Sequence, residues 1–374
     1  MKFFVFLSAV IFLSSASLKA QELRSTWSPP QFGMTKAIGY SSDTFAVPES
    51  LKPDVDFWIR IYTKYTTQQG VFHIAGDTQK ILGDIDLSET FTNPQWSDIR
   101  KELEAELVIK KARKKIAALH KIKNINQIRL QMGLKDRMLK AIELSGLYLP
   151  MMEKIFTEKK LPLELTRMVF VESSFNIEAG SKAGASGLWQ IMPRLARKFK
   201  YINVSYDQRN HPVYSTQLAA QILKENYQIL KSWPLAVTAY NHGVGSLKKI
   251  VKKYGVRDIG YLADNVKAKK SFGFASRNFY ATFLAALHVE SHANLYFPEP
   301  IIKRSELKPR ELRITKAMKY EQLLAMFDDD KDSLKLYNPH LRSKFLKQGR
   351  TLPAKTILCL PESSKKRTAE IENP

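Results

Sequence analysis

The chain contains 374 residues, which is enough for two or three domains. Lysine and arginine number 59 against 36 aspartate and glutamate residues, so the net charge is +23 and the surface should attract a polyanion. The single cysteine, Cys359, excludes an intramolecular disulfide. The sequence has no zinc-finger, RNA-recognition or helix-turn-helix signature that would favour nucleic acid as the polyanion.

Residues 1–20 have the pattern of a secretory signal peptide. Lys2 precedes an apolar run over residues 3–13, and small residues lead to Ala20, after which we expect cleavage. This run is too short to cross a membrane, and no other apolar stretch is long enough. We therefore expect an exported protein, periplasmic or secreted, without a transmembrane segment. Its basic surface could then contact anionic wall polymers or lipid surfaces.

Residues 21–150 are expected to form a mostly helical region that supports the next domain. Ser, Pro and Thr are frequent in residues 21–50, which indicates an extended lead. Residues 94–150 show the spacing of long amphipathic helices. The basic run at 110–115 is interpreted as one solvated helix face rather than a dedicated binding site.

Glu172 ends an apolar helical stripe. Pro162 suits the first turn of a helix, and five residues around and after it share one face at helical spacing, namely Leu161, Leu165, Met168, Val169 and Glu172. A carboxyl beside apolar groups favours its neutral form, so it can hold a proton at neutral pH, as a general acid must. The alternative is that Glu172 turns to the rim of the stripe and stays solvated.

Two further segments have unusual patterns. Residues 180–193 read Gly-Ser-Lys-Ala-Gly-Ala-Ser-Gly-Leu-Trp-Gln-Ile-Met-Pro, where three glycines let the backbone approach a ligand closely. Within them, residues 188–192 read as a short extended segment. Residues 236–243 read Ala-Val-Thr-Ala-Tyr-Asn-His-Gly, which predicts a helix end with Gly243 as its C-cap.

Together these three segments resemble the catalytic domain of the soluble lytic transglycosylase (SLT) family, closest to the membrane-bound murein transglycosylase D type. The resemblance implies a lysozyme-like, mostly helical catalytic domain over residues 151–297. Family members cleave the MurNAc–GlcNAc β-1,4 bond of peptidoglycan without water and leave 1,6-anhydromuramic acid ends. A single carboxyl can serve as both acid and base in that reaction. The other carboxylates between Glu172 and Tyr240 lie outside any catalytic motif.

Matching the motifs residue by residue implies a role for each position. Glu172 takes the acid/base place, supported by Ser181 and Tyr280. The implied substrate-binding residues are Gly187, Leu188, Gln190, Met192, Tyr240 and Asn241. As alternatives, Tyr240 and Tyr280 could be core aromatics, and Ser181 and Gln190 could cap backbone groups. The chain departs from the family pattern at Ser276, Arg277 and Asn210.

The C-terminal part is predicted to be a separate small module. Pro298, Pro300 and Pro309 indicate a linker, and residues 310–362 read as strand, helix, helix, strand. This order resembles a degenerate LysM module, a βααβ unit that binds N-acetylglucosamine chains. A structural appendage that binds no glycan is the alternative. The charged tail from residue 363 to residue 374 is expected to be disordered.

The sequence therefore predicts a mainly α-helical, monomeric lytic transglycosylase that binds peptidoglycan glycan strands. A hydrolytic muramidase on the same fold and an inert wall-binding protein are the alternatives, since fold alone does not fix function. The seven histidines are scattered without ligand pairing, and no glycine-rich phosphate loop precedes a helix, so we expect neither a metal site nor a cofactor.

Overall fold

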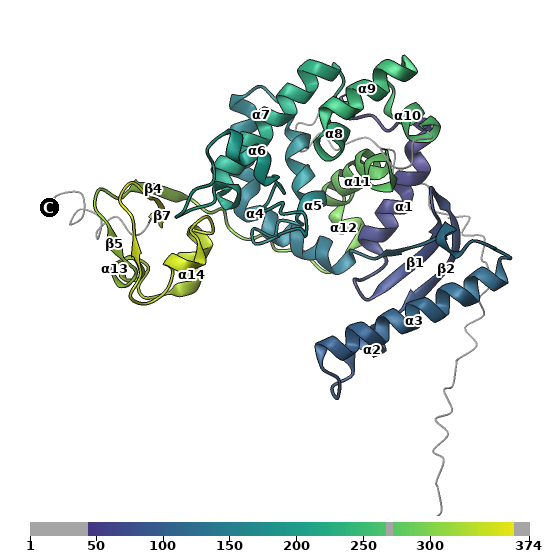
Figure 1. Ribbon diagram of the computed structural model, residues 1–374, viewed down its shortest axis with the longest axis horizontal. Coiled ribbons are helices and arrows are strands. Elements are labelled where there is room, and N and C mark those ends of the chain that lie inside the picture. The colour runs from purple at the N-terminus through teal and green to yellow at the C-terminus, as the bar shows by residue number, and fades with distance from the viewer. Residues whose placement is uncertain (1–43, 267–271, 363–374) are drawn as a thin grey trace, which may run out of the picture. The chain divides into compact units, whose positions relative to one another are not determined.

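The computed structural model describes residues 44–266 and 272–362, drawn as the coloured ribbon in Figure 1. The predicted signal peptide, most of the predicted lead and the predicted tail lie outside the described residues. The chain divides into two compact units. Among the described residues, 68–131 belong to one unit, and 44–67 and 132–362 belong to the other, apart from the gap at 267–271.

The unit at 68–131 combines a three-stranded sheet with a long helix. Its elements are β1 (Gln69–Ile74), β2 (Asp77–Asp86), α2 (Ser88–Thr92), α3 (Asp98–Leu119), η3 (Ile125–Gln127) and β3 (Ile128–Met132), and the strand order is β2-β1-β3. Phe72, Leu82 and Ile128 of the sheet pack with Ile116 of α3. The lysines of the basic run in α3 are exposed, so the prediction of a solvated helix face is confirmed.

The sheet was not predicted, because residues 21–150 were expected to be mostly helical. The reason lies in β1, which buries four consecutive residues, from Gly70 to His73. A strand that is buried on both faces lacks the alternation of apolar and polar residues that identifies strands in a sequence. The long helices that the 94–150 spacing predicts are separated between Leu119 and Lys135, where η3 and β3 intervene.

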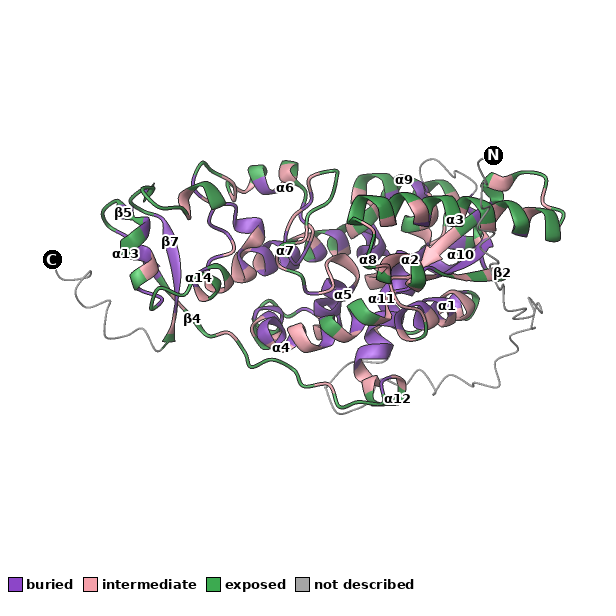
Figure 2. Ribbon diagram, turned by 90° about the horizontal axis from the view of Figure 1, so that it is seen from below, coloured by how far each residue is buried: buried purple, intermediate pink, exposed green. Residues whose placement is uncertain are grey.

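The larger unit is mainly helical, as predicted. Its elements before the C-terminal module are η2 (Glu49–Leu51), α1 (Lys52–Thr63), α4 (Lys135–Glu158), η4 (Leu163–Arg167), α5 (Met168–Glu172), α6 (Pro193–Lys198), η5 (Gln208–Asn210), α7 (Pro212–Leu230), α8 (Trp233–His242), α9 (Val244–Tyr254), α10 (Ile259–Asn265), α11 (Phe274–Ser291) and α12 (Ala293–Tyr296). The central helix is α11, which packs against α1, α5 and α8. All its residues from 278 to 290 are buried, as the purple ribbon in Figure 2 shows.

The helical unit includes residues that were expected to lie outside the catalytic domain. The predicted boundary at residue 150 falls inside α4, and α1 belongs to the same unit. The start of α4 is tied to the end of α1, because the Lys135 N–H donates to the Tyr65 carbonyl over 2.9 Å. Gly133 lies against the same carbonyl, which would be 2.1 Å from an added Cβ. The two compact units therefore meet near residue 132 in the sequence.

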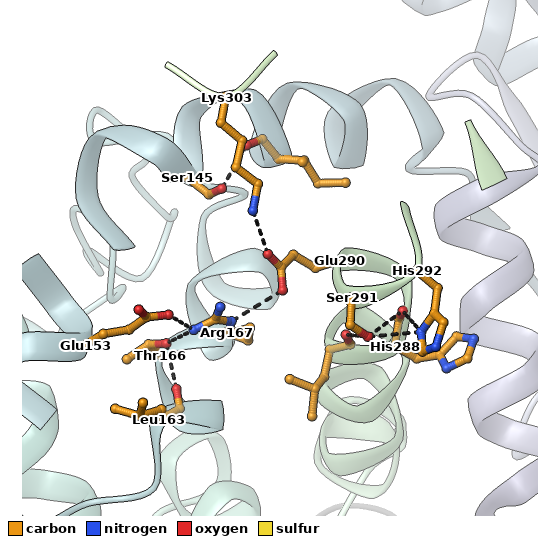
Figure 3. Close-up of polar contacts among 12 residues, drawn as sticks. Ser145, Glu153, Leu163, Thr166, Arg167, His288, Glu290, Ser291, His292 and Lys303 are labelled. Carbon is orange, nitrogen blue, oxygen red and sulfur yellow. Dashed lines mark hydrogen bonds and ion pairs between the residues drawn. The ribbon is translucent and has the colours of Figure 1, made fainter. Parts of the chain in front are cut away.

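A buried ion network joins α4, η4 and α11 to the segment after α12, as Figure 3 shows. The guanidinium of Arg167 contacts the carboxylates of Glu153 and Glu290, and the Lys303 ammonium lies 2.8 Å from the second oxygen of Glu290. Burial raises the pKa of Glu290, but Arg167 and then Lys303 outweigh it and hold this pKa below its usual value. Each buried charge in the network therefore has a partner of opposite sign.

The proline-rich segment predicted to be a linker is fixed along α4. The Arg304 N–H donates to the Glu143 carbonyl over 2.9 Å, and the Leu307 N–H donates to the Leu147 carbonyl over 3.1 Å. Gly146 permits this close approach, since an added Cβ would lie 2.1 Å from the Arg304 carbonyl oxygen. The segment thus behaves as part of the helical unit rather than as a free tether.

The C-terminal module has the predicted order of elements. They are β4 (Pro309–Arg313), β5 (Met318–Lys319), α13 (Tyr320–Ala325), α14 (Lys331–Tyr337), η6 (Ser343–Phe345), β6 (Thr351–Leu352) and β7 (Ile357–Pro361). The strands β4 and β7 pair antiparallel, with Leu312 opposite Leu358, and the short β5–β6 pair was not predicted. Leu323, Leu334 and Leu358 lie in its core. The resemblance of this module to LysM stays a prediction.

The module contacts the helical part of the same unit, called the helical lobe below, through the segment just before α7. The Asp207 N–H donates to the His340 carbonyl over 2.8 Å, and the Arg342 N–H donates to the Ser205 carbonyl over 3.1 Å. Close by, the His211 ring lies against the thiol of Cys359. The spacing of the histidines in the sequence did not indicate this contact of His211. Its partner is 148 residues away in sequence, beyond the reach of any spacing pattern.

Among the described residues, no helix combines the length and the apolar character needed to span a bilayer.

Candidate active site

Glu172 ends α5 and reaches an open cleft. The predicted stripe is buried, since Leu161, Leu165, Met168 and Val169 are all at most 7% exposed. The helix begins differently from the prediction, because Pro162 caps a 3-10 turn, η4, that leads into the short α5. Glu172 itself is half-buried and lines a cleft of about 650 Å³.

The cleft combines apolar, polar and charged side chains. It is lined by Tyr62, Leu134, Arg137, Lys140, Leu144, Phe170, Val171, Glu172, Ser173, Ser174, Asn176, Glu178, Ala179, Gly180 and Gln190. These residues come from α1, the start of α4, the end of α5 and the glycine-rich loop. The helical packing and the loop are therefore both needed to form it.

The environment of Glu172 favours its protonated form. Burial raises the pKa of Glu172 to about 8. Burial, and then the charge of Glu172, raise the pKa of Tyr240 well above its usual value, so this phenol stays protonated next to the carboxyl. At neutral pH Glu172 can therefore hold a proton for transfer, as a general acid requires. These shifts favour the acid interpretation over the solvated-rim alternative.

Ser173 is a site residue that the sequence analysis missed. Its hydroxyl donates to the carbonyl of Leu188 over 2.8 Å, which ties the end of α5 to the glycine-rich loop. The sequence did show a serine directly after Glu172 at a predicted helix end. Serine side chains at such positions often form hydrogen bonds with nearby backbone groups, so a backbone partner could have been expected. Its long-range partner could not be identified from the sequence.

The glycine-rich loop is a tight turn rather than the extended segment predicted for residues 188–192. Ser186 and Ile191 pair as an isolated bridge, with residues 187–190 turning between them. Gly187 has φ +77°, and an added Cβ would lie 2.2 Å from the carbonyl oxygen of Arg209. Gln190 also has a positive φ, of 44°. Its side-chain amide donates to the carbonyls of Ala179 and Gly187 over 3.0 and 2.9 Å.

A buried ion pair clamps this loop from outside the cleft. Arg209 bonds to Asp207 over 2.7 Å, and its guanidinium also donates to the carbonyls of Gly184 and Ile191 over 2.6 and 3.0 Å. The departure from the family pattern at Asn210 lies in the same clamp, where the Ser186 hydroxyl donates to its side-chain oxygen over 2.7 Å. The amide at this position therefore accepts the bond that a carboxylate could also accept.

The predicted substrate-binding residues differ in their access to solvent. Tyr240 faces Glu172, and its hydroxyl donates to the carbonyl of Trp189 over 2.8 Å. Met192 and Asn241 are exposed, and Gln190 lines the cleft. Leu188 has no exposed surface in the structure, and its role as a substrate-binding residue stays a prediction. Gly187 is also buried and shapes the turn.

The two predicted supporting residues have backbone partners. The Ser181 side chain accepts from the Ala185 N–H over 2.9 Å, which matches the capping alternative. Tyr280 is fully buried in α11, and its hydroxyl donates to the Ala46 carbonyl over 3.3 Å. A role of either residue in orienting Glu172 stays a prediction.

The comparisons with known proteins cover the segment that contains Glu172. Residues 153–262 match the family model of the transglycosylase SLT domain. This segment is a transglycosylase SLT domain. It contains Glu172, the glycine-rich loop and Tyr240, so the family resemblance inferred from the motifs is confirmed for this part of the chain.

Two relatives extend the comparison. The membrane-bound lytic murein transglycosylase D of Escherichia coli K12 is 36% identical over 97 residues, which are 25% of this chain and 22% of that protein. A putative tributyltin chloride resistance protein of Alteromonas sp. is 36% identical over 107 residues, 27% of this chain and 52% of that protein. The chain therefore spans about a fifth of the first relative and half of the second.

Two solved structures of lytic transglycosylases also align with part of this chain. The 70-kDa soluble lytic transglycosylase of Escherichia coli aligns over 40% of this chain and 24% of its own, with 21% identity and a TM-score of 0.31. An inactive mutant of the lytic transglycosylase Slt from Pseudomonas aeruginosa aligns over 41% of this chain and 25% of its own, with 23% identity and a TM-score of 0.28.

Proposed function

We propose that this protein is a peptidoglycan lytic transglycosylase in which Glu172 is both general acid and general base. The observation that carries the proposal is the position of Glu172 in an SLT domain. It lies at an open cleft, and burial raises its pKa to about 8. The Escherichia coli relative named above is described as a membrane-bound lytic murein transglycosylase, which supports peptidoglycan glycan strands as the substrate.

The first step uses the proton that Glu172 holds. The carboxyl donates it to the glycosidic oxygen between N-acetylmuramic acid and N-acetylglucosamine, and the bond from that oxygen to the muramyl C1 breaks. The bonding electron pair leaves with the oxygen, which becomes the free 4-hydroxyl of the departing sugar. Positive charge develops on the muramyl ring, next to the Glu172 carboxylate that has just formed.

The second step returns the proton. The Glu172 carboxylate takes the proton of the muramyl C6 hydroxyl, and the C6 oxygen bonds to C1 to close a 1,6-anhydro ring. No water is consumed, and Glu172 ends protonated as it began. The Tyr240 hydroxyl, held by the Trp189 carbonyl, lies close enough to Glu172 to contribute a fixed dipole at the cleavage point.

A hydrolytic muramidase is the second candidate, because another carboxylate lines the same cleft. Glu178 is exposed on the loop side of the cleft, and its backbone N–H donates to the Asn176 side chain over 2.9 Å. Hydrolases of this kind use two carboxylates, one of which activates water or acts as nucleophile. The sequence alone gave Glu178 no such role, since it lies outside the recognised motifs.

One digestion separates the two reactions. Purified sacculi are treated with the protein in heavy-oxygen water, and the released muropeptides are analysed by mass spectrometry. A transglycosylase leaves unlabelled anhydromuramyl ends, whereas a muramidase leaves reducing ends that carry the label. Glu178→Gln should retain most activity if Glu172 works alone. Label in the products, together with an inactive Glu178→Gln protein, would establish the hydrolytic reaction instead.

The site of action follows from the same proposal. Peptidoglycan lies outside the cytoplasmic membrane, so the protein must be exported to act on it, to the periplasm or beyond. The net charge of +23 would favour contact with anionic wall components. Because the relatives align over only part of their length, the substrate form and the site of action remain part of the proposal.

A further inference from the structure

Three potential metal ligands meet where the C-terminal module contacts the helical lobe. His211 directly precedes α7, Glu311 lies in β4 and Cys359 lies in β7. The Nε2 atom of His211 is 3.2 Å from the Cys359 Sγ and 3.7 Å from a Glu311 carboxylate oxygen. All three ligand atoms lie within 4.8 Å of one another. The imidazole and the thiol are buried, whereas the carboxylate opens to solvent.

These atoms have the types and spacing that zinc requires. Zn²⁺ binds imidazole nitrogen, thiolate sulfur and carboxylate oxygen at about 2.0–2.3 Å in tetrahedral sites. Two ligands of one tetrahedral ion are therefore roughly 3.3–3.6 Å apart. The observed separations of 3.2 and 3.7 Å lie near this range, so an ion could enter with small side-chain shifts. A soft thiolate in the set also disfavours Ca²⁺ and Mg²⁺.

A second histidine packs beside the cluster. His340 packs beside His211, with ring centroids 4.6 Å apart, and its Nε2 lies 3.0 Å from the Ile357 carbonyl. Donation at Nε2 leaves the His340 Nδ1 as a bare lone pair. Among the described residues, this atom and the His211 Nδ1 are buried without a hydrogen-bond partner, so His340 is a polar neighbour of the cluster but adds no ligand to it.

The carboxylate also has an outer partner. The Tyr214 hydroxyl donates to the second oxygen of Glu311 over 3.2 Å, which orients the first oxygen toward His211. Metal ligands commonly have such supporting hydrogen bonds. The cluster is thus built from both sides of the junction: His211 and Tyr214 come from the lobe, and Glu311 and Cys359 come from the module.

We propose that His211, Glu311 and Cys359 bind one Zn²⁺ ion, with a water on the solvent side as fourth ligand, and that this ion fastens the C-terminal module to the helical lobe. On binding, the S–H bond of Cys359 breaks, an S–Zn bond forms, and one proton passes to solvent. His211 binds as the neutral imidazole through Nε2. The ion is structural, since it lies outside the cleft that contains Glu172.

A thiol–imidazole hydrogen bond without any ion is the competing explanation of the 3.2 Å contact. The two explanations differ in their protons. In the hydrogen bond without an ion, Cys359 keeps its S–H proton and contacts the His211 Nε2. Zinc must displace that proton, so its affinity should rise as pH rises, whereas a hydrogen bond predicts no zinc binding at all.

The test uses the full exported chain without a histidine tag. The protein is dialysed against Zn²⁺ and then against metal-free buffer, and its metal content is measured by mass spectrometry. We expect about one zinc per chain. Because Cys359 is the only cysteine, a thiol reagent reports directly on it, and zinc should slow that reaction. Replacing zinc by Co²⁺ should give the absorption band of a thiolate–cobalt bond.

Variants identify the ligands. Cys359→Ser and His211→Gln should each lower zinc affinity by about 10–100-fold or more and abolish the increase in Tm that zinc gives. His292→Gln, which removes a histidine of the separate His288–His292 pair, is the matched control and should still bind one zinc. If a buried variant fails to fold, Glu311→Gln replaces it, since this side chain is 41% exposed. It should weaken binding about tenfold with the fold intact.

Absence of bound zinc in the wild-type protein would overturn the proposal and leave the thiol–imidazole hydrogen bond as the explanation. So would a zinc stoichiometry and affinity that are unchanged in all three ligand variants, because the ion would then bind elsewhere.

Discussion

Ser173, the residue that follows Glu172, donates a hydrogen bond to the backbone carbonyl of Leu188 over 2.8 Å. This bond connects the end of the acid-bearing helix to the turn that forms one wall of the cleft. Position matters for general acid catalysis, because proton transfer requires the donor within hydrogen-bond reach of the leaving oxygen. In the proposed mechanism, the bond would fix the distance between the Glu172 carboxyl and the loop residues predicted to bind the sugar.

Ser173→Ala should lower kcat by more than the loss of stability alone would explain. We expect a loss of about 1 kcal/mol in the free energy of unfolding, as for a typical hydrogen bond, and a roughly tenfold fall in kcat as the loop moves relative to Glu172. The matched control is Ser145→Ala, which removes a buried bond of 2.7 Å to the Ile142 carbonyl in α4, away from the cleft. Equal falls in kcat for the two variants would show that Ser173 acts only through stability.

Glu172→Gln should remove glycan cleavage while preserving the fold. The amide has no proton to donate at this step, and general acid–base groups typically contribute about 10²–10⁴-fold to rate. Release of muropeptides from sacculi measures the loss, and circular dichroism checks the fold. A folded Glu172→Gln protein that releases muropeptides at nearly the wild-type rate would refute the assignment.

The rate should depend on pH through the protonated form of Glu172. Since burial raises this pKa to about 8, the acid is present at neutral pH and is lost as pH rises through about 8. We expect kcat/KM on a soluble glycan fragment to stay level from about pH 6 to pH 7 and to fall above pH 8. An ordinary solvated carboxyl would instead lose activity between about pH 4 and pH 5, and that profile would contradict the assignment.

Glu172 should also reduce stability in alkaline solution. The pKa of Glu172 is higher in the folded than in the unfolded protein. Its contribution to the free energy of unfolding is therefore fully present below about pH 4.5 and is lost as pH rises through about 8. Glu172→Gln should therefore stabilise the protein by on the order of 1–3 kcal/mol near pH 9, after allowance for partial solvent exposure, and change little near pH 4. Urea unfolding at the two pH values measures this difference, and equal effects at both would contradict it.

Gly187 should tolerate no side chain. An added Cβ would lie 2.2 Å from the Arg209 carbonyl oxygen, and φ is +77°, so Gly187→Ala should destabilise the protein by about 2–4 kcal/mol and disrupt the turn below Gln190. Gly245→Ala is the control, because Gly245 lies in the first turn of α9 and no heavy atom lies within 4 Å of its added Cβ. Thermal unfolding compares the two. A Gly187→Ala protein as stable as the control would show that the loop can shift.

Local patterns in the sequence predicted the parts of this structure that depend on neighbouring residues. The apolar stripe before Glu172 and the C-cap at Gly243 follow from helical periodicity and glycine conformation, and the structure has both. The order of elements in the C-terminal module was predicted in the same way. These features depend on residues that lie close together in the sequence.

The features that were missed depend on contacts between distant residues. Two such contacts are that of Gly146 with Arg304 and that of His211 with Cys359, which form only in the folded chain. The spacing of residues in the sequence therefore indicated neither the packed linker nor the ligand cluster. The sheet around Phe72 was missed for a different reason, since its central strand is buried on both faces and lacks alternation. The clamp by Arg209 on the glycine-rich loop again joins separate segments.

The C-terminal module should bind glycan through its own cleft. A hollow of about 490 Å³ lies between α13 and the segment before β6, and three lysines line it, Lys331, Lys335 and Lys347. A second weak site on the same chain raises the effective affinity for an insoluble polymer without new catalytic contacts. Replacing the three lysines by alanine should weaken pelleting with sacculi yet spare turnover of short soluble fragments.

The control for this prediction removes the same charge elsewhere. Lys248, Lys249 and Lys252 are exposed on α9, outside the module, and their triple alanine variant loses three positive charges as well. Attraction between solvated charges is screened beyond about 8 Å at physiological ionic strength, so added salt should weaken pelleting of every variant through that general term. Only the module variant should remain weaker than wild type at high salt. If the two triple variants pellet equally across a salt series, net charge alone holds the protein to the wall, and the module serves as a structural appendage.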